Sequence, residues 1–588
     1  MSPAEGAVPA GDAPRDDSPP ARAVSAQRRQ GWIELARDAA APAHYLSLIV
    51  GVAVILYLDR SNWFLGDEFE FFGRMQPGTS LNLLVPHNGH WSTVPILLTL
   101  GLYKVYGLRS FLPYALMDIA AHLAVVHLLW RWMRRLGADP WVATGLAAVF
   151  VVVGGGVENV WSWFQVSFVL PVALGLAAAF LVDHTEAGSG RDLLTWPLGV
   201  AAVMCSGVGV IMVFLYALLA LLRRGWRAAF RVAVLPAVVY LAWFAAIGRE
   251  YLSLQPGPLW QHFLVFDYAW TGLTSAVGAT VGWSGFGPIL FVALLVWLFL
   301  ERRRIRTNTA FVFASAGVAL LYFVLLGVDR VTAGLWESTL TRYGYIGIAL
   351  LLPATADVLT RLARRGVTGR VVVLTACGLA VVGSVGSWVT FVQTWNPITT
   401  TTEGQVLAAA HLLQSGAPLA VTGGAGVEPV HSGNLTVDML RSMIGTGSIS
   451  TDAPVSATDM LNAELFLQVG ISSSAPTGTG QAARIDPASL PLVTATGDGC
   501  VSAGSASGTS VLQLDFAGPG AVAMSTEQSS EMTLQLSLTG TPGVASSATS
   551  TFGLTAGQKT YLEVTASGVA TLLTLPAGTT TICGLGGG

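Results

Sequence analysis

Long apolar runs with almost no charge dominate the first two thirds of this chain and constrain its fold more than any other feature. From residue 45 to residue 392, uncharged stretches of roughly 14 to 22 residues recur. Inside a lipid bilayer, such a run forms a helix, because a helix satisfies its backbone N–H and C=O groups with hydrogen bonds between them. Charged residues make up 11% of the chain, whereas about 25% is typical of globular proteins. The sequence therefore predicts an α-helical, polytopic membrane protein.

The topology follows from the positions of these runs and of the arginines. We predict about eleven transmembrane helices, at residues 45–58, 111–132, 141–153, 166–181, 193–205, 210–222, 230–247, 288–300, 310–328, 345–359 and 371–392. Arginine clusters then fall on one side of the membrane, at residues 131–135, 223–227, 302–306 and 361–370. Short basic loops stay in the cytoplasm, so this side is predicted to be cytoplasmic.

Two segments fit more than one topology. A crossing at residues 92–107 would put the arginines of residues 131–135 outside, so we predict a helix that lies on the outer surface. Residues 193–222 could form one long helix or two short ones. We predict two, broken at Ser206-Gly207-Val208-Gly209, because glycines at membrane depth usually mark a break. Reversing both choices also gives a consistent topology, but it leaves three arginines on the wrong side.

The two ends of the chain differ from this middle part. Residues 1–40 are polar and rich in Pro, Ala and Arg, without the apolar core of a signal peptide. We predict a disordered cytoplasmic tail, a transmembrane domain at residues 41–395 in the plasma (inner) membrane, and an extracytoplasmic C-terminal region. Two outer loops, at residues 59–110 and 248–287, are the largest within the transmembrane domain.

The C-terminal region is rich in Gly, Ser, Thr and Ala and contains no further membrane run. For residues 396–490 we predict an α/β segment, with a strand at 419–422 and helices at 403–413 and near 436–443. Short alternating segments between Gly, Pro and Ser turns then predict a β-sandwich or jelly roll at residues 491–588.

Charge and cysteine usage add two expectations for this region. From residue 397 onward, 3 basic residues stand against 12 acidic ones, which argues against nucleic-acid binding. Cys500 and Cys583 bracket the β unit in an oxidising compartment, so we predict a disulfide between them. Cys205 and Cys377 fall inside predicted helices and are expected to be packed there.

The first outer loop carries a pair of acids close to the membrane, Asp67 and Glu68, in Gly66-Asp67-Glu68-Phe69-Glu70-Phe71. Charge at this depth is costly without a purpose, so both are candidate catalytic residues. The structural alternative is that the two carboxylates cap a helix at the membrane surface.

His87 and His90 follow in Pro86-His87-Asn88-Gly89-His90-Trp91. Their rings could hold an anionic head group or a metal ion, but His-x-x-His is a weak metal signal. The alternative is a hydrated turn with an aromatic anchor.

Two further turns place polar side chains at the outer surface. The turn at residues 154–165 contains Glu158, Asn159, Trp163 and Gln165, and rings beside acids and amides suit sugars. Its alternative is an aromatic belt with polar caps. Near the tenth predicted helix, the Arg342-Tyr343 pair could grip a phosphate through the planar guanidinium. The alternative is an arginine that extends to lipid head groups.

Together these features resemble the GT-C superfamily of multispanning glycosyltransferases, which includes protein O-mannosyltransferases and aminoarabinose transferases. The resemblance covers about residues 45 to 392 and rests on the acid pair after the first helix, on the segment that leads through Pro95 into a surface helix, and on a second large outer loop after the seventh helix. The chain departs from these relatives in having a single proline there with no lysine directly after it.

The resemblance implies an inverting transfer of a sugar from a polyprenyl-phosphate donor to a glycan, lipid or protein acceptor. Asp67 would be the base, assisted by Glu68. His87, His90, Glu158, Asn159, Trp163, Gln165, Arg342 and Tyr343 would bind the donor phosphate and sugar. No cofactor is required, and a divalent cation remains compatible with the carboxylates and histidines. The rival interpretations are a transporter of lipid-linked sugars and a non-catalytic protein of envelope assembly that binds glycan.

Overall fold

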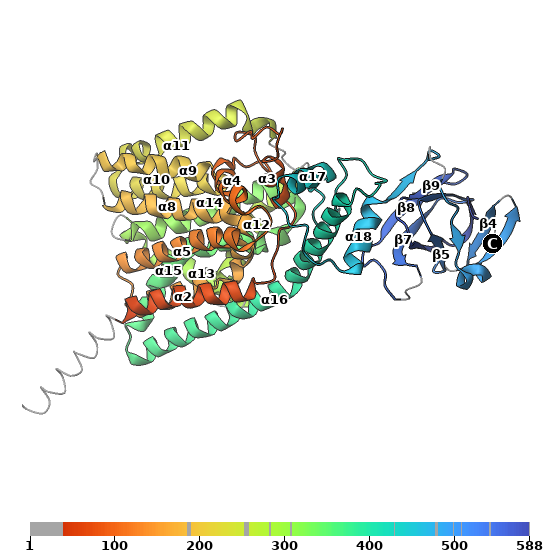
Figure 1. Ribbon diagram of the computed structural model, residues 1–588. Coiled ribbons are helices and arrows are strands. Elements are labelled where there is room, and N and C mark those ends of the chain that lie inside the picture. The colour runs from red at the N-terminus through yellow and green to blue at the C-terminus, as the bar shows by residue number, and fades with distance from the viewer. Residues whose placement is uncertain are drawn as a thin grey trace, which may run out of the picture.

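The chain folds into a helical bundle and a separate β domain, and the end of one long helix and two short helices lie between them (Figure 1). The computed structural model describes residues 39–184, 190–251, 258–280, 284–305, 309–428, 430–476, 480–497, 499–506, 508–539 and 543–586. The predicted tail at residues 1–40 lies almost wholly outside the described residues, as does Arg306 of one arginine cluster.

Eight helices among the described residues are long and apolar enough to cross a membrane. They are α2 (Ala40–Leu58), α5 (Leu112–Arg135), α8 (Val166–His184), α10 (Gly207–Arg224), α11 (Trp226–Ala246), α14 (Ala310–Arg330), α15 (Thr341–Ala363) and α16 (Val367–Gln414). The protein is thus a mostly helical chain with several candidate spans, as the apolar runs predict.

Three predicted spans fall on shorter helices, so the count of eleven is not confirmed. These are α6 (Pro140–Val151), α9 (Thr195–Val203) and α13 (Gly287–Glu301), with 12, 9 and 15 residues. At 1.5 Å per residue, a helix of 12 residues is about 18 Å long, well short of the hydrocarbon thickness of about 30 Å. The predicted outer loop at 248–287 also contains a helix, α12 (Val265–Thr280), which packs into the bundle where Gly272 meets the Phe323 ring of α14.

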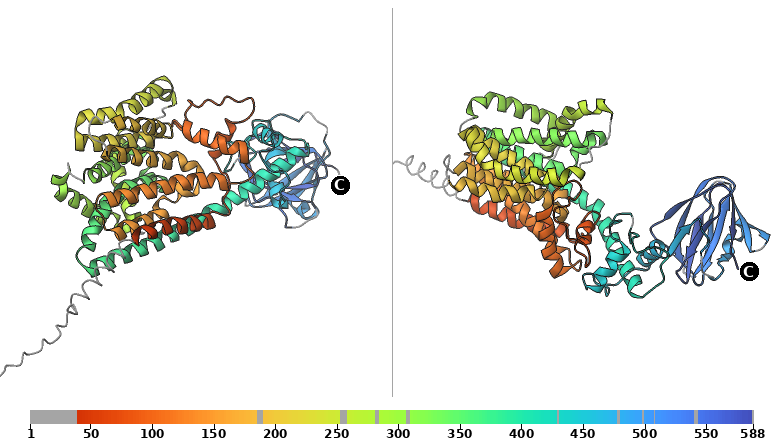
Figure 2. Two further views of the ribbon diagram at one scale, coloured as in Figure 1. Left: turned by 60° about the vertical axis from the view of Figure 1, so that its left-hand side comes forward. Right: turned by 90° about the horizontal axis from the view of Figure 1, so that it is seen from above.

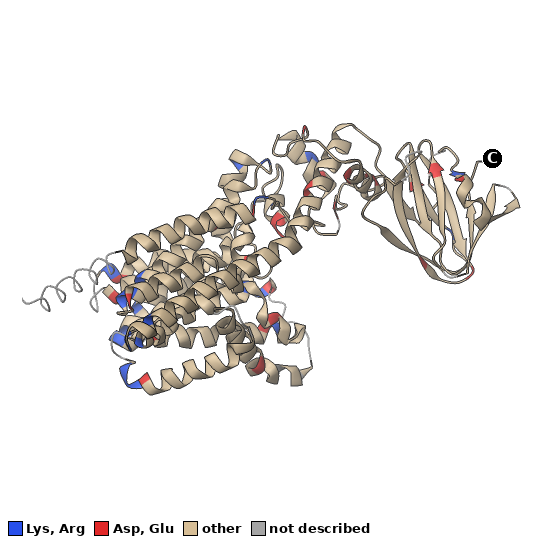
Figure 3. Cartoon of the chain, turned by 90° about the horizontal axis from the view of Figure 1, so that it is seen from below, with Lys and Arg blue, Asp and Glu red and all other residues tan. Residues whose placement is uncertain are grey.

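Most basic side chains gather at the end of the bundle that lies away from the β domain (Figure 3). We call this end the basic end and the opposite one the domain end. Acidic side chains neutralise part of the charge there: Asp183 pairs with Arg135 (2.8 Å) and with Arg223, and Glu301 pairs with Arg361 (2.7 Å). The arginine clusters therefore share one side, and which side of the cell they face stays a prediction.

The predicted division of residues 193–222 into two helices is confirmed, although only α9 is short: α10 has 18 residues and begins with the glycines where the break was predicted. The α9 helix ends at Val203 and α10 begins at Gly207, with the Ser206 hydroxyl donating to the Ser167 carbonyl (2.7 Å). Gly209 allows the start of α10 to lie close to the end of α9, because a Cβ on Gly209 would lie 2.0 Å from the Ala202 carbonyl oxygen.

The segment at 92–107 forms α4 (Thr93–Tyr106), which has 14 residues and is too short to be a candidate span. Its N-terminal Val94 N–H donates to the Met204 carbonyl (3.1 Å) in the α9–α10 break. Just past its C-terminus, the Leu108 N–H donates to the Ser448 carbonyl (2.6 Å) of the C-terminal region. These contacts join both ends of α4 to elements of the domain end.

The α16 helix runs for 48 residues, about 72 Å, from the basic end to beyond the domain end (Figures 1 and 2). The predicted boundary at residue 395 therefore lies inside a helix, and the predicted helix at 403–413 is the last part of α16. The α17 helix (Val437–Gly445) matches the helix predicted near 436–443. The strand predicted at 419–422 is wrong, because these residues form no strand.

Two antiparallel sheets form the C-terminal domain, with strand orders β1-β9-β6-β11-β4-β3 and β2-β5-β10-β7-β8. From β4 to β11 the eight strands have the order of a jelly roll: each strand lies in the other sheet from the one before it, except that β7 and β8 pair within one sheet. The strands are β1 (Val469–Ser472), β2 (Arg484–Ile485), β3 (Val493–Gly497), β4 (Cys500–Ser505), β5 (Val511–Phe516), β6 (Gly520–Thr526), β7 (Ser530–Leu538), β8 (Ser550–Leu554), β9 (Thr560–Val564), β10 (Val569–Thr574) and β11 (Gly578–Cys583).

The α18 helix (Ala457–Leu467) joins this sandwich to the rest of the domain end. Its Leu461 and Leu465 belong to the sandwich core, whereas Ala463 and Leu467 belong to the core that packs against the first outer loop. One helix thus contributes apolar side chains to two hydrophobic cores.

The predicted disulfide is confirmed. Cys500 and Cys583 are opposite each other on the neighbouring strands β4 and β11, and their sulfur atoms are bonded. Cys205 and Cys377 are free and buried.

The first prediction tests which side of the membrane the domain end faces. Gln558, exposed between β8 and β9, and Arg365, exposed at the basic end, are suitable sites for a new cysteine. We expect Gln558→Cys to react with an impermeant thiol reagent in whole cells, and Arg365→Cys to react only after permeabilisation. The opposite pattern would reverse the predicted orientation.

The second prediction concerns the contribution of the disulfide to stability. It closes a loop with a sequence separation of 83 residues, for which the chain-entropy model gives about 4.5 kcal/mol. The double variant Cys500→Ser/Cys583→Ser should have a lower Tm, and reductant should lower the Tm of the wild type but not of this variant. A wild-type Tm that is insensitive to reductant would contradict this.

Candidate functional site

A cavity of about 850 Å³ lies at the domain end, between the first outer loop and the membrane helices. Its polar lining comes from the start of α3 (Glu68–Gly73), from the turn at residues 87–92, from the turn between α6 and α8, and from the facing ends of α14 and α15. Its apolar lining comes from α10, α11 and α14, through Val208, Val210, Ile211, Tyr240, Leu325 and Leu326. One part of the cavity is therefore lined by charged and polar side chains, and another part by apolar side chains.

Asp67 is exposed and lines this cavity. It stands at the N-cap position of α3, but its side chain makes no capping hydrogen bond. Instead, its Oδ2 accepts a hydrogen bond from Asn88 Nδ2 (2.9 Å). The capping interpretation is thus wrong for Asp67, whose carboxylate faces the cavity.

Glu68 is buried at the edge of the same cavity and accepts three hydrogen bonds. The donors are Trp163 Nε1 (2.8 Å), Ser162 Oγ (3.1 Å) and the Leu65 N–H (3.2 Å). These donors favour the charged form, but burial outweighs them and raises the pKa of Glu68 to about 8. Glu68 therefore ties α3 to the turn before α8 and carries a proton through much of the neutral range.

A tight two-residue hairpin presents Asn88 to Asp67. His87 and His90 exchange backbone hydrogen bonds (2.9 and 2.8 Å), and the two residues between them have positive φ values, 47° for Asn88 and 76° for Gly89. Asn-Gly is the preferred pair for such a type I′ turn. The Asn88 amide also lies 3.1 Å from His87 Nε2.

The two histidines of this hairpin have different environments. His87 Nδ1 lies 2.9 Å from a carboxylate oxygen of Glu70, whose other oxygen pairs with Arg74 (2.9 Å). Burial alone would raise the pKa of Glu70, but His87 and Arg74 lower it to about 2. Desolvation, followed by the charge of Arg330, lowers the pKa of His90 to about 4. His90 is therefore a neutral ring at physiological pH.

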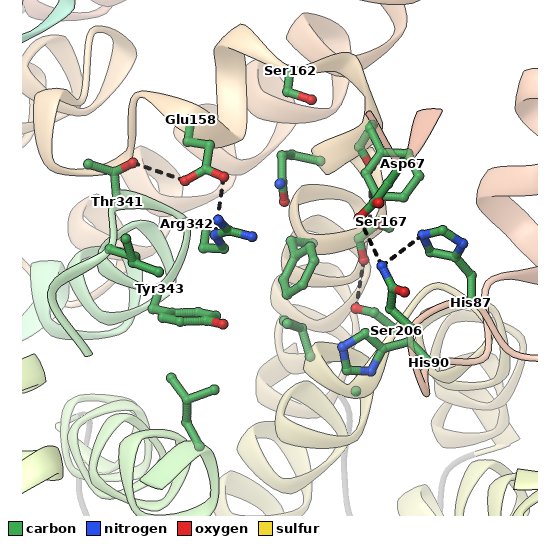
Figure 4. A pocket seen from close by; sticks show the side chains of 18 of the residues that line it. Asp67, His87, His90, Glu158, Ser162, Ser167, Ser206, Thr341, Arg342 and Tyr343 are labelled. Atoms are coloured by element: carbon green, nitrogen blue, oxygen red, sulfur yellow. Dashed lines mark hydrogen bonds and ion pairs between the residues drawn. The ribbon is translucent and has the colours of Figure 1, made fainter. Parts of the chain in front are cut away.

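Glu158 and Arg342 form an ion pair on the other side of the cavity, opposite Asp67 and the histidines (Figure 4). Glu158 Oε1 lies 3.1 Å from Arg342 Nε, and the Thr341 hydroxyl donates to Oε2 (3.4 Å). Burial raises the pKa of Glu158, and the charge of Arg342 opposes this rise. A second arginine, Arg330, pairs with Asp329 (2.9 Å) at the end of α14 and also lines the cavity.

Three consecutive glycines place the Glu158 turn against the bundle. A Cβ on Gly154 would lie 2.8 Å from the Ser387 Cβ of α16, one on Gly155 would lie 2.4 Å from the Ala279 Cβ of α12, and one on Gly156 would lie 2.8 Å from the Tyr345 Cβ of α15. Three helices thus approach the turn too closely for any side chain. This packing brings Glu158 beside Arg342.

Eight of the ten predicted site residues line the cavity, and two do not. Those that line it are Asp67, Glu68, His87, His90, Glu158, Gln165, Arg342 and Tyr343. Asn159 is fully buried, and its amide, with the nitrogen toward α15, bonds the carbonyls of Arg342 (3.1 Å) and Thr341 (3.3 Å). Trp163 is also fully buried, as the donor to Glu68. The prediction that these two bind sugar or phosphate is corrected: they hold the turn to its neighbours.

The cavity also contains polar residues outside the predicted set. Asn88, Ser206, Asp329 and Arg330 are the main ones. The Asn-Gly pair was a signal for Asn88, since it marks a hairpin between the two histidines. Among the described residues, no three His, Cys, Asp or Glu side chains are grouped so that they could hold a metal ion.

Scans of protein-family models and searches of curated proteins and solved structures gave no match to this chain. The resemblance to glycosyltransferases therefore remains an interpretation of the residues.

The third prediction follows from the raised pKa of Glu68. An acid that holds its proton more tightly in the folded protein than in the unfolded chain stabilises the fold at low pH, and this contribution is lost as the pH rises from about 4.5 to about 8. Glu68→Gln is always neutral, so its Tm should fall less than the wild-type Tm between about pH 5 and about pH 8.

The matched control is Glu531→Gln, which changes an exposed acid of β7 and should follow the wild-type curve. Parallel curves for the wild type and Glu68→Gln would show that Glu68 is ionised throughout this range.

Proposed function

We propose that this protein is a glycosyltransferase of the plasma membrane that transfers a sugar from a polyprenyl-phosphate donor to an acceptor at the domain end. The observation that carries the proposal is one cavity in which the Asp67 carboxylate lies across from Arg342, with Arg330 also in the lining, beside an apolar wall of candidate membrane helices. A lipid-linked sugar phosphate has these same three parts. The resemblance to the GT-C superfamily supports the same conclusion.

The donor phosphate would lie on the side of Arg342 and Arg330. A guanidinium has five N–H donors in a planar fork that matches phosphate oxygens. Arg342 pairs with Glu158, and Arg330 pairs with Asp329 and with Glu337 (3.2 Å), so each arginine has more donors than these ion pairs use. Both arginines are partly exposed, at 40% and 36% of their side-chain surface. They would stabilise the negative charge that develops on the leaving phosphate.

The isoprenoid chain of the donor would leave the cavity along its apolar wall. Ile211 of α10, Tyr240 of α11 and Leu325 of α14 line this wall. All three helices are candidate spans, so their apolar surfaces continue into the lipid.

Asp67 would act as the base on the opposite side. Its carboxylate takes the proton of an acceptor hydroxyl while the hydroxyl oxygen forms a bond to the anomeric carbon. The bond between that carbon and the phosphate oxygen breaks, and the phosphate leaves with the electron pair. Because attack comes from the face opposite the phosphate, the configuration at the anomeric carbon inverts. The hydrogen bond from Asn88 holds Oδ2 and leaves Oδ1 for the acceptor.

The non-catalytic alternative predicts an acid pair in a closed loop without a cavity, so the cavity beside Asp67 favours transfer. The acceptor would be a glycan, a lipid or a protein that approaches from the domain end, where the first loop and the C-terminal region are found. No cofactor takes part in these steps.

The fourth prediction tests the base. Asp67→Asn keeps the size of the side chain but removes its negative charge, so transfer from a polyprenyl-phosphate sugar should fall at least about 10²-fold with an unchanged Tm. Asp452→Asn, which changes an exposed acid between α17 and α18 outside the cavity, should keep wild-type activity. Normal transfer by Asp67→Asn would rule out Asp67 as the base.

A further inference from the structure

We propose that a segment of the C-terminal region, residues 423–428 and 430–448, positions Asp67, and that Ser432 is its main contact. This inference rests on the proposed role of Asp67 as the base. The Gly66 N–H, directly before Asp67, donates a long hydrogen bond to Ser432 Oγ (3.4 Å). Ser432 is fully buried, although 366 residues separate it from Gly66 along the chain.

Three glycines of the first outer loop are the points where this segment makes contact. Gly66 has a φ of +58°, and a Cβ there would lie 3.6 Å from the carbonyl oxygen of His431. A Cβ on Gly73 would lie 3.5 Å from Met439 Sδ, and one on Gly107 would lie 2.2 Å from the Ser448 carbonyl oxygen. The loop and the segment thus fit together at the start of α3, at its end, and after α4.

The segment itself is held firmly around Ser432. The carboxylate of Glu428 is buried and accepts hydrogen bonds from the N–H groups of Val430 (3.2 Å) and His431 (2.8 Å). The Val427 N–H donates to the Leu435 carbonyl (2.9 Å) across the turn. Because these hydrogen bonds hold the backbone around Ser432, its hydroxyl can fix the position of the Gly66 N–H.

Apolar packing ties the same segment to the aromatic side chains around the acid pair. Val427 and Leu435 are fully buried in one hydrophobic core with Phe64, Phe69 and Phe72 of the first loop. The turn that carries Asp67 therefore has this core on one side and the cavity on the other.

Each of three anchors fixes a different part of the turn. Ser432 holds the backbone at Gly66, Asn88 holds the carboxylate of Asp67, and Trp163 holds Glu68. Removing the Ser432 hydroxyl frees the backbone next to Asp67 without touching the arginines on the far side of the cavity. The rate of transfer should then suffer more than donor binding.

The experiment compares Ser432→Ala and the nearly isosteric Ser432→Cys with a matched control, Ser546→Ala. Ser546 is also buried and bonded to backbone groups, at Leu536 and Ala548, but it lies in the jelly roll. Hydrogen–deuterium exchange of residues 64–72 is measured in each protein, together with kcat and KM for transfer from polyprenyl-phosphate mannose. The exchange measurement does not depend on activity.

For both Ser432 variants we expect faster exchange in residues 64–72, a kcat reduced about tenfold and a KM within about twofold of wild type. Ser546→Ala should match the wild type in both readouts. Unchanged exchange in both Ser432 variants, or faster exchange with an unchanged kcat, would overturn the positioning role. If the wild type transfers no sugar, the proposed function fails, and faster exchange confined to residues 64–72 would still support the structural part of the inference.

Discussion

The structure of the domain end depends on the burial of an aromatic cluster in one hydrophobic core that the first outer loop shares with the C-terminal region. Phe64, Phe69 and Phe72 are fully buried, and the C-terminal region supplies much of their cover, including Val406 of α16 and Leu440 of α17. Burying a side chain of this kind contributes about 1.5–3 kcal/mol. These contacts hold α3 in place, so the position of the acid pair is a consequence of packing between parts of the chain that are far apart in sequence.

Features that depend on local pattern could be predicted from the sequence. Apolar run length predicted the candidate spans, and the glycines after Ser206 predicted the helix break, because both follow from backbone hydrogen bonding in lipid. Alternating strands with Gly and Ser turns predicted the β domain, and the expected oxidising location of Cys500 and Cys583 predicted their disulfide. The acids and arginines that line the cavity could also be predicted from the sequence, because charged side chains close to a membrane are costly unless they are paired or functional.

Features that depend on tertiary contacts could not be predicted in this way. Composition does not distinguish a tryptophan that stacks on a sugar from one that donates to a buried acid, so Trp163 was assigned to the wrong role. Nor does it show that α16 continues past the membrane, because Pro397 and a polar composition suggest an end to a helix. The contact between Ser432 and Gly66 has no sequence signal at all, since it joins two turns that only the fold brings together.

The central claim is that a single cavity holds the donor phosphate opposite Asp67. The most direct test is an electron cryo-microscopy structure of the protein in a lipid nanodisc with a polyprenyl phosphate bound. The account predicts the phosphate within hydrogen-bonding distance of Arg342 or Arg330, with the isoprenoid chain against α10, α11 and α14. A lipid phosphate bound elsewhere on the protein, with this cavity filled by side chains or closed to lipid, would contradict it.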